Sequence, residues 1–373
     1  NAVYWTRDFH IDALRLDAVH GIFDSSVSHI LKDLRDAVHE EAEITGRLVS
    51  VIAESDFNDV KLLAAPSKGG YGLDGQWNDD FHHALHALVT GERQGYYEDF
   101  GSLEHLATAF RKHFVLSGQY SHHRHRRHGN SATHILPSQF VVFAQNHDQI
   151  GNRAQGDRLS ALIPFAAQQV VAASVLLSPF IPLLFMGEEY GEHAPFQYFI
   201  DHGDEHLIEA VRKGRLAEFK PFGWKNIPDP YALNTFEHSR LTPLEARDDT
   251  QQRLAAWTKQ LISLRKQHAS LGTGVKGHQL RVWMNPDKSV LTIYRKNPNT
   301  LAMLLILGFN DKPITLTLHQ PKGQWTLLLD SGQSEYVEPN SGPSSQAPDT
   351  LDLTPSKPSF SLPAFPAWVY KQA

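Results

Sequence analysis

Four short apolar segments, each followed at once by polar residues, are the feature that most constrains the fold of this chain. Their composition is typical of strands covered on both faces, as a parallel sheet requires. Helix-like stretches at 28–45 and 159–177 lie between them, so strands and helices alternate as in βα units. The expected strands are residues 11–18, 48–53, 140–144 and 181–186. The pattern therefore predicts a parallel α/β architecture.

A different pattern begins near residue 272. The segment 249–271 carries Leu254, Trp257, Leu261 and Leu264 on one helical stripe, and we expect it to close the first domain. Runs rich in β-branched residues then follow at 289–294, 301–307, 314–318 and 325–329. A Pro- and Ser-rich loop at 337–359 precedes a last strand at 360–370. We expect two domains, residues 1–272 and 273–373, the second a small antiparallel β-sandwich.

Composition excludes several classes of ligand. The 373 residues include 35 Lys and Arg and 41 Asp and Glu, a net charge of −6. That balance does not favour nucleic acid or an anionic membrane surface, so neutral small molecules are the expected ligands. The absence of cysteine excludes disulfides, thiolate metal sites and cysteine nucleophiles, and it favours the cytoplasm. The most apolar stretch, 163–187, contains glutamines and prolines, which predicts a buried helix followed by a strand and not a membrane span.

Charged side chains follow the ends of three expected strands. Arg15 and Asp17 close the first, Glu54 the second, and His147 and Asp148 the third. Parallel α/β folds build their active sites at the carboxyl ends of strands. A single carboxylate there is more often a helix cap or an ion-pair partner, but three together favour a catalytic site. A carboxylate pair suits glycoside hydrolysis, in which one acid protonates the leaving oxygen and the other attacks or stabilises the anomeric carbon.

Three motifs resemble the α-amylase family of glycoside hydrolases. ALRLDAVHGI at 13–22, VIAES at 51–55 and FAQNHDQIGNR at 143–153 are similar to that family's fourth-, fifth- and seventh-strand motifs, in the same order. The resemblance implies a (β/α)8 TIM barrel with Asp17 as nucleophile and Glu54 as general acid and base. It makes Asp148 the carboxylate that stabilises the transition state, with Arg15 and His147 holding the nucleophile and the sugar.

Further segments, at 76–100, 184–202 and 223–241, resemble the maltooligosyltrehalose trehalohydrolases of that family. This implies retaining cleavage of the α-1,4 bond next to the terminal trehalose unit of maltooligosyltrehalose, without cofactor or metal, releasing trehalose and a maltooligosaccharide. The implied substrate contacts are Arg15, Val19, His20, Gly21, Ile22, Phe23, Asp24, Asp79, Asp80, Phe81, His82, His83, His147, Gln149, Ile150, Gly151 and Asn152. We expect Asp80, His82 and His83 to hydrogen-bond the second glucose of the trehalose unit and so to discriminate against plain maltodextrins.

One expected motif is missing. The family carries a sequence similar to DVVYNH after its third strand, and none occurs here. Because the first strand of this chain matches the family's fourth, we expect strands four to eight only. Unpaired parallel strands would expose an apolar edge, so the expected partner is the absent N-terminal half of the barrel.

Several alternatives remain open. A glucan branching or transferring enzyme would use the same carboxylates, whereas a non-catalytic glucan-binding barrel is disfavoured because all three are present. Asp79 is as well placed to cap a helix as to contact sugar. For the run HHRHRRH at 122–128 a solvated, partly charged loop is favoured over a metal site. Either sugar stacking or core packing fits the aromatic residues Trp77, Tyr96, Tyr97, Phe196 and Tyr198.

Overall fold

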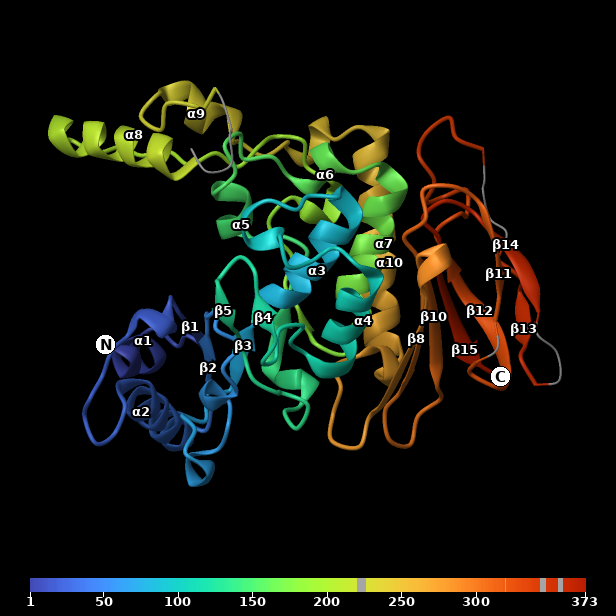
Figure 1. Cartoon of the computed structure of the whole chain (residues 1–373), viewed down its shortest axis with the longest axis horizontal. Coiled ribbons are helices and arrows are strands. Elements are labelled where there is room, and N and C mark those ends of the chain that lie inside the picture. The colour runs from blue at the N-terminus through green and yellow to red at the C-terminus, as the bar shows by residue number, and fades with distance from the viewer. Residues whose placement is uncertain (220–225, 319, 343–346, 355–357) are drawn as a thin grey trace.

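A computed structural model describes residues 1–219, 226–318, 320–342, 347–354 and 358–373. The start of the segment 223–241 and parts of the loop 337–359 therefore lie outside the described residues. Figure 1 shows an α/β part, coloured blue to yellow, beside an all-β part coloured orange to red.

A five-stranded parallel sheet organises the first part. Its strands, in spatial order, are β1 (Ala13–Leu16), β2 (Ser50–Ala53), β3 (Gly75–Trp77), β6 (Phe140–Val142) and β7 (Ile181–Pro182). The predicted parallel arrangement is confirmed. The sequence did not reveal β3, which has only three residues. The expected burial on both faces holds for β6 but is wrong for β1, which contains no buried residue. Within the described residues β1 pairs with β2 alone, and an edge strand keeps one side open.

Ten α-helices are described, and the predicted ones at 28–45 and 249–271 are confirmed with shifted ends. The stretch 159–177 is two helices, because Pro164 lacks the N–H that would continue the first. Within the described residues, none of these helices has both the length and the apolar character to span a membrane. They are α1 (Ala2–Asp8), α2 (Ile30–Thr45), α3 (Asp79–Thr90), α4 (Leu103–Lys112), α5 (His147–Gly151), α6 (Leu159–Leu162), α7 (Phe165–Leu176), α8 (Glu205–Phe219), α9 (Leu233–His238) and α10 (Asp249–Gln267).

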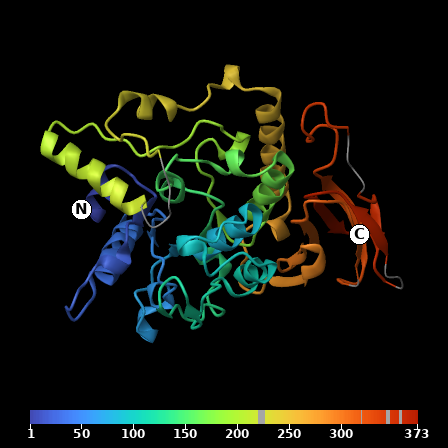
Figure 2. The same cartoon turned by 45° about the horizontal axis from the view of Figure 1, so that its top comes forward.

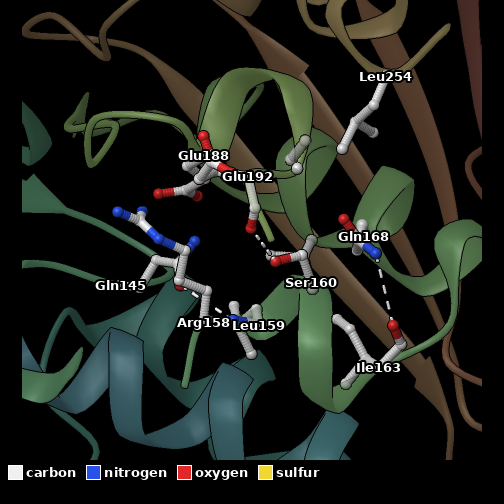
Figure 3. A pocket seen from close by; sticks show the side chains of 12 residues that line it. Gln145, Arg158, Leu159, Ser160, Ile163, Gln168, Glu188, Glu192 and Leu254 are labelled. Atoms are coloured by element: carbon white, nitrogen blue, oxygen red, sulfur yellow. Dashed lines mark hydrogen bonds between the residues drawn. The ribbon is translucent and has the colours of Figure 1, made fainter. Parts of the chain in front are cut away.

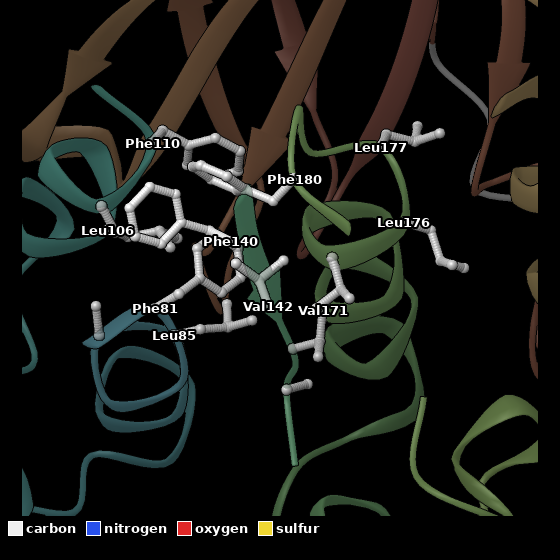
Figure 4. Packing of buried hydrophobic residues seen from close by; sticks show 14 of the residues in the cluster. Phe81, Leu85, Leu106, Phe110, Phe140, Val142, Val171, Leu176, Leu177 and Phe180 are labelled. Atoms are coloured by element: carbon white, nitrogen blue, oxygen red, sulfur yellow. The ribbon is translucent and has the colours of Figure 1, made fainter. Parts of the chain in front are cut away.

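The core of this part forms around β6. Figure 4 shows side chains of α3, α4 and α7 meeting Phe140 and Val142 of that strand. Phe81 contacts Phe110 edge-on at 5.4 Å and Phe180 at 5.9 Å between ring centroids. Each fully buried aromatic ring contributes on the order of 2 to 3 kcal/mol of hydrophobic stabilisation, so this cluster fixes β6 and the residues that follow it.

The C-terminal part is antiparallel, as predicted. A six-stranded sheet has the order β13 (Thr350–Asp352), β12 (Gln324–Asp330), β15 (Ala367–Gln372), β10 (Met303–Gly308), β9 (Val290–Lys296) and β8 (Gln279–Asn285). β11 (Ile314–Thr317) pairs with β14 (Ser359–Leu362). The single last strand expected at 360–370 is wrong: β14 and β15 are separate strands, because Pro363 and Pro366 interrupt the run. The expected loop at 337–359 contains β13, whose Leu351 is buried.

Arg295 joins the two parts of the molecule. It lies on β9, and its Nη1 donates to the carbonyl oxygens of Leu177 and Leu271, the latter at 2.9 Å, while Nη2 donates to that of Gly272. The side chain is almost fully buried. One guanidinium therefore satisfies carbonyl groups that follow α7 and α10, at the point where the chain leaves the α/β part.

We expect Arg295→Met to lower the free energy of unfolding by about 3 kcal/mol, because it leaves the Leu177 and Gly272 carbonyl groups without their donor and leaves that of Leu271 with Arg265 alone. Urea unfolding followed by circular dichroism measures the change. Arg281→Met, on the exposed face of β8, is the matched control and should change stability by less than about 0.5 kcal/mol. Equal losses in the two variants would contradict a joining role for Arg295.

Candidate active site

Two of the predicted carboxylates share one guanidinium. Arg15 lies on β1, Asp17 directly follows that strand, and Glu54 directly follows the neighbouring strand β2. Arg15 Nη1 donates to Asp17 Oδ1, and Arg15 Nη2 lies 3.9 Å from Glu54 Oε2. The Asp17 side chain is 79% exposed and that of Glu54 only 14%. Arg15 therefore holds an accessible carboxylate and a sheltered one on adjacent strand ends.

The backbone at Ala18 fixes Glu54. Ala18 has φ 41° and ψ 47°, a left-handed conformation that costs a non-glycine residue about 1 kcal/mol or more. This turn directs its N–H to Glu54 Oε2 at 2.6 Å, and the next amide, of Val19, donates to the Glu54 carbonyl at 3.1 Å. The turn after β1 thus orients the carboxylate that follows β2.

The third carboxylate, Asp148, lies in the first turn of α5, after β6. The side chain of Asn146 caps this helix by accepting hydrogen bonds from the N–H groups of Asp148 at 2.8 Å and Gln149 at 3.2 Å. Four residues on, Asn152 Nδ2 donates to Asp148 Oδ1 at 3.2 Å. The Asn146 cap thus fixes the backbone position of Asp148, and the hydrogen bond from Asn152 orients the Asp148 carboxylate.

Glu54 and Asp148 line a cleft of about 250 Å³, whereas Asp17 and Arg15 are not among its lining residues. Its lining residues are His20, Glu54, Asp56, Asp79, His83, Tyr96, His123, Asp148, Gln149 and Asn152. Among the described residues, several buried polar atoms here have no hydrogen-bond partner: Arg15 Nε, Arg15 Nη2, His20 Nδ1, Asp56 Oδ1 and Gln149 Oε1. Some of these atoms lie near an opposite charge, His20 Nδ1 at 3.8 Å from Asp56 Oδ1 and Arg15 Nη2 at 3.9 Å from Glu54 Oε2, but none of them forms a hydrogen bond with a described residue. Buried polar groups are nearly always hydrogen-bonded, so this concentration favours a site for a polar ligand.

Asp79 is held in the cleft as an acid that keeps its proton. Burial, together with the negative charges of Glu54, Asp56, Asp80 and Asp148, raises the pKa of Asp79 to about 8. Gln149 Nε2 lies 3.4 Å from its Oδ1. At neutral pH the Asp79 carboxyl group is therefore a hydrogen-bond donor as well as an acceptor.

The structure does not bring all of the segment 79–83 to the cleft. His83 and Asp79 line it, but Asp80 Oδ2 accepts from Asn58 Nδ2 and from the N–H groups of Val115 and Leu116 at 2.7–2.9 Å. Phe81 is in the core. His82 Nδ1 contacts the Ala144 carbonyl and Nε2 the Tyr97 hydroxyl. The expectation that Asp80 and His82 hydrogen-bond sugar is therefore not supported, because their polar atoms are already bound within the protein.

The other two expected segments divide in the same way. Around β1, His20 lines the cleft, Val19 is buried, Gly21, Ile22 and Phe23 are exposed, and Asp24 accepts hydrogen bonds from the N–H groups of Ser26 and Ile30. In the second segment, Asp148, Gln149 and Asn152 line the cleft, Ile150 and Gly151 are buried behind it, and His147 lies against Trp77. Trp77 itself packs under Arg15, with 4.6 Å from the guanidinium carbon to the ring centroid.

The histidine-rich run is a folded hairpin at the cleft. Its strands are β4 (Tyr120–Ser121) and β5 (Arg126–Arg127). Arg124 Nη2 donates to Asp56 Oδ2 at 2.7 Å, and the buried His128 contacts the Asp56 carbonyl at 2.8 Å. The favoured reading as a solvated loop is thus wrong for part of the run. Sequence reasoning also missed Asp56 and His123 as cleft residues, although Asp56 follows Glu54 by two positions.

A second cavity lies between α6, α7 and the turn Glu188–Tyr190 (Figure 3). Burial raises the pKa of Glu188 to about 8 there. The side chain of Glu192 accepts from Thr242, Tyr190 and the N–H groups of His193 and Ala194, which ties this turn together. Within the described part of the chain, this cavity shares no lining residue with the cleft.

Comparison with known proteins agrees with this geometry. No family model matches the chain. A malto-oligosyltrehalose trehalohydrolase of Arthrobacter ramosus is 47% identical over 270 residues, which are 72% of this chain and 47% of that protein. One of Saccharolobus solfataricus is 46% identical over 268 residues, 72% of this chain and 45% of that protein. The crystal structure of a putative α-amylase from Salmonella typhimurium matches with a TM-score of 0.81 at 33% identity, covering all of this chain and 59% of that one.

Over the matched residues, the chain is therefore similar to trehalohydrolases and to a solved structure of the α-amylase family. The resemblance to the trehalohydrolases that was predicted from the sequence is confirmed. The α/β fold of this family, with antiparallel sheets towards the C-terminus, is confirmed as well. The chain spans about half the length of the curated relatives that it matches.

The raised pKa of Asp79 predicts a pH-dependent penalty to stability. Between about pH 4 and pH 8 the unfolded chain ionises Asp79 while the folded protein keeps the proton, so the group destabilises the fold increasingly as pH rises to about 8. We expect Asp79→Asn to raise the free energy of unfolding by about 1 kcal/mol or more at pH 8 and by little at pH 4. Urea unfolding at the two pH values measures this, with the exposed Asp287→Asn as control. An equal effect of Asp79→Asn at both pH values would contradict a raised pKa of this carboxyl group.

Proposed function

We propose that the protein is a retaining glycoside hydrolase that cleaves the α-1,4-glucosidic bond next to the terminal trehalose unit of maltooligosyltrehalose. The products are trehalose and a shortened maltooligosaccharide. The observation that carries the proposal is the arrangement of the carboxylates: Arg15 contacts both Asp17 and Glu54, and Glu54 lines the same cleft as Asp148. The names of the relatives supply the substrate.

The exposure of the two strand-end carboxylates supports their different roles. Asp17, the accessible one, attacks the anomeric carbon, and a glycosyl ester forms as the bond to the leaving oxygen breaks. Glu54, the sheltered one, gives its proton to that oxygen and then takes a proton from the water that hydrolyses the ester. Asp148 stabilises the positive charge that develops on the sugar ring in both steps.

The five parallel strands correspond in this proposal to strands four to eight of an eight-stranded barrel, followed by a β-sandwich at 273–373. Supporting this, the sheet is open at β1 and the curated relatives are about twice as long. Apolar side chains on that side of the sheet, among them Trp5, Phe9 and Ile11, are exposed. The first half of the barrel would cover these side chains.

We also propose that the protein is located in the cytoplasm.

In this proposal the polar groups of the cleft wall determine the specificity for a substrate that ends in trehalose. His83 is almost fully buried, its ring packs between Tyr96 and Phe100 at 5.0 and 5.1 Å, and it faces the cleft. Burial lowers the pKa of His83 to about 3, so the ring is neutral and offers one donor and one acceptor. A site that pairs such groups with the bent, non-reducing disaccharide leaves them unpaired when plain maltodextrin binds.

Asp17→Asn tests the covalent mechanism. Because the side chain is exposed, we expect the melting temperature to stay unchanged while trehalose release falls by at least about 1,000-fold, since the amide cannot attack. Chromatography of products from maltooligosyltrehalose measures the rate. Asp12→Asn, an exposed aspartate before β1, is the control and should retain activity. Full activity of Asp17→Asn would contradict the mechanism, and transfer of glucan to another sugar would identify a branching or transferring enzyme instead.

A pair of variants tests the specificity assignment. We expect His83→Ala to lower kcat/KM for maltooligosyltrehalose at least about tenfold more than for plain maltooligosaccharide, a difference of roughly 1.4 kcal/mol. Asp80→Asn is the matched comparison, because its carboxylate binds only groups within the protein in the structure. It should affect both substrates alike and act through stability. Equal losses on both substrates for His83→Ala would move specificity to another wall of the cleft.

A further inference from the structure

Helix α8 extends outward from the α/β part (Figures 1 and 2). Its Arg215 contacts Gly151 and the cleft residue Asn152. Arg215 Nη2 donates to the carbonyl of Gly151 at 2.9 Å, and Nη1 donates to Asn152 Oδ1 at 3.0 Å. Both acceptors lie at the C-terminal end of α5, the short helix that carries Asp148. Arg215 of α8 thus binds the C-terminal end of α5, the helix that carries the candidate catalytic residue Asp148.

The Arg215 guanidinium is firmly held. Its central carbon lies 4.5 Å from the ring centroid of Tyr198 and 4.4 Å from that of Phe219, and Nη1 also donates to Glu218 Oε2 at 2.9 Å. The side chain is only 11% exposed. Aromatic rings and a carboxylate around a partly desolvated cation make its position well defined.

The contact with Arg215 determines which way the Asn152 amide faces. A guanidinium has only donors, so it selects the amide oxygen of Asn152 and leaves the NH₂ group on the other side. That NH₂ group donates to Asp148 Oδ1 at 3.2 Å. Rotating the amide by half a turn would place its oxygen against the Asp148 carboxylate and its NH₂ against the cation, and both contacts would be lost.

We infer that Arg215 is a positioning residue for Asp148, acting through the side-chain amide of Asn152. The inference rests on the proposed glycoside hydrolase function, but not on which α-1,4-glucan is the substrate. A carboxylate that stabilises a transition state must be held to within about 0.5 Å and 10–20° of its productive geometry. Loss of Arg215 frees the Asn152 amide to rotate and the Asp148 carboxylate to move, so the chemical step slows while substrate binding persists.

The test is a double-mutant cycle in the full-length protein. We expect Arg215→Gln to lower kcat about tenfold with KM changed less than about twofold, and Asn152→Ala to lower kcat to a similar extent. Because both act on one hydrogen bond, the double variant should lose no more than the worse single variant. Arg212→Gln is the matched control: it lies one turn earlier on α8 and pairs with Asp229 and Glu209, and its kcat should match the wild type.

The outcomes separate the possibilities. If losses multiply in the double variant, or if Arg212→Gln loses as much as Arg215→Gln, Arg215 only stabilises α8 and the inference fails. If Arg215→Gln does not fold, Arg215→Met, which keeps the aliphatic stem and removes every donor, takes its place, and a kcat equal to that of wild type would overturn the inference. If the wild type cleaves plain maltodextrin but releases no trehalose, the substrate proposal fails and the cycle is run on maltodextrin. A wild type that cleaves neither overturns both.

Discussion

The contact of the Arg15 guanidinium with Asp17 and Glu54 is the interaction on which the site depends. The two carboxylates follow adjacent parallel strands, so the register between β1 and β2 sets their separation. Two negative charges so close would repel each other, and the cation between them offsets that repulsion. Trp77, from the next strand, packs on the same guanidinium and limits its movement. Residues at the ends of β1, β2 and β3 thus hold the Arg15 guanidinium in place, and Arg15 in turn positions the carboxylates of Asp17 and Glu54.

Several carboxylates lie close together at the cleft, and the protein neutralises their negative charge in different ways. Asp56 is paired with Arg124, which outweighs burial and lowers its pKa. Among the described residues Asp79 forms no ion pair with a cation, and its pKa rises instead. One carboxylate is therefore kept ionised and another neutral within the same cleft. Such divergence is common where a site must present both donors and acceptors to a ligand that, like a sugar, carries hydroxyl groups.

Sequence alone was sufficient to place Asp17 and Glu54 directly after strands and Asp148 beyond β6, because local pattern decides those positions, while their catalytic roles stay predictions. It was insufficient within 79–83, because successive residues of a helix point about 100° apart and only the packing of α3 decides which side faces the cleft. Asp80 and His83 look equally suitable in the sequence, yet one holds Val115 and the other lines the cleft. The hairpin at 120–128 was undervalued for a similar reason. Its role depends on Asp56, more than sixty positions earlier.

The position of Asp148 shows how far such dependence extends. His82, on α3, contacts the Ala144 carbonyl before α5, and Arg153, just after α5, forms two hydrogen bonds of 2.9 and 2.8 Å with Glu92. Arg215, on α8, binds the end of α5 itself. The segment that carries Asp148 is thus held before, at and after its short helix by groups far away in the sequence. A five-residue helix has little stability of its own, so these contacts, and not helix propensity, determine where the carboxylate lies.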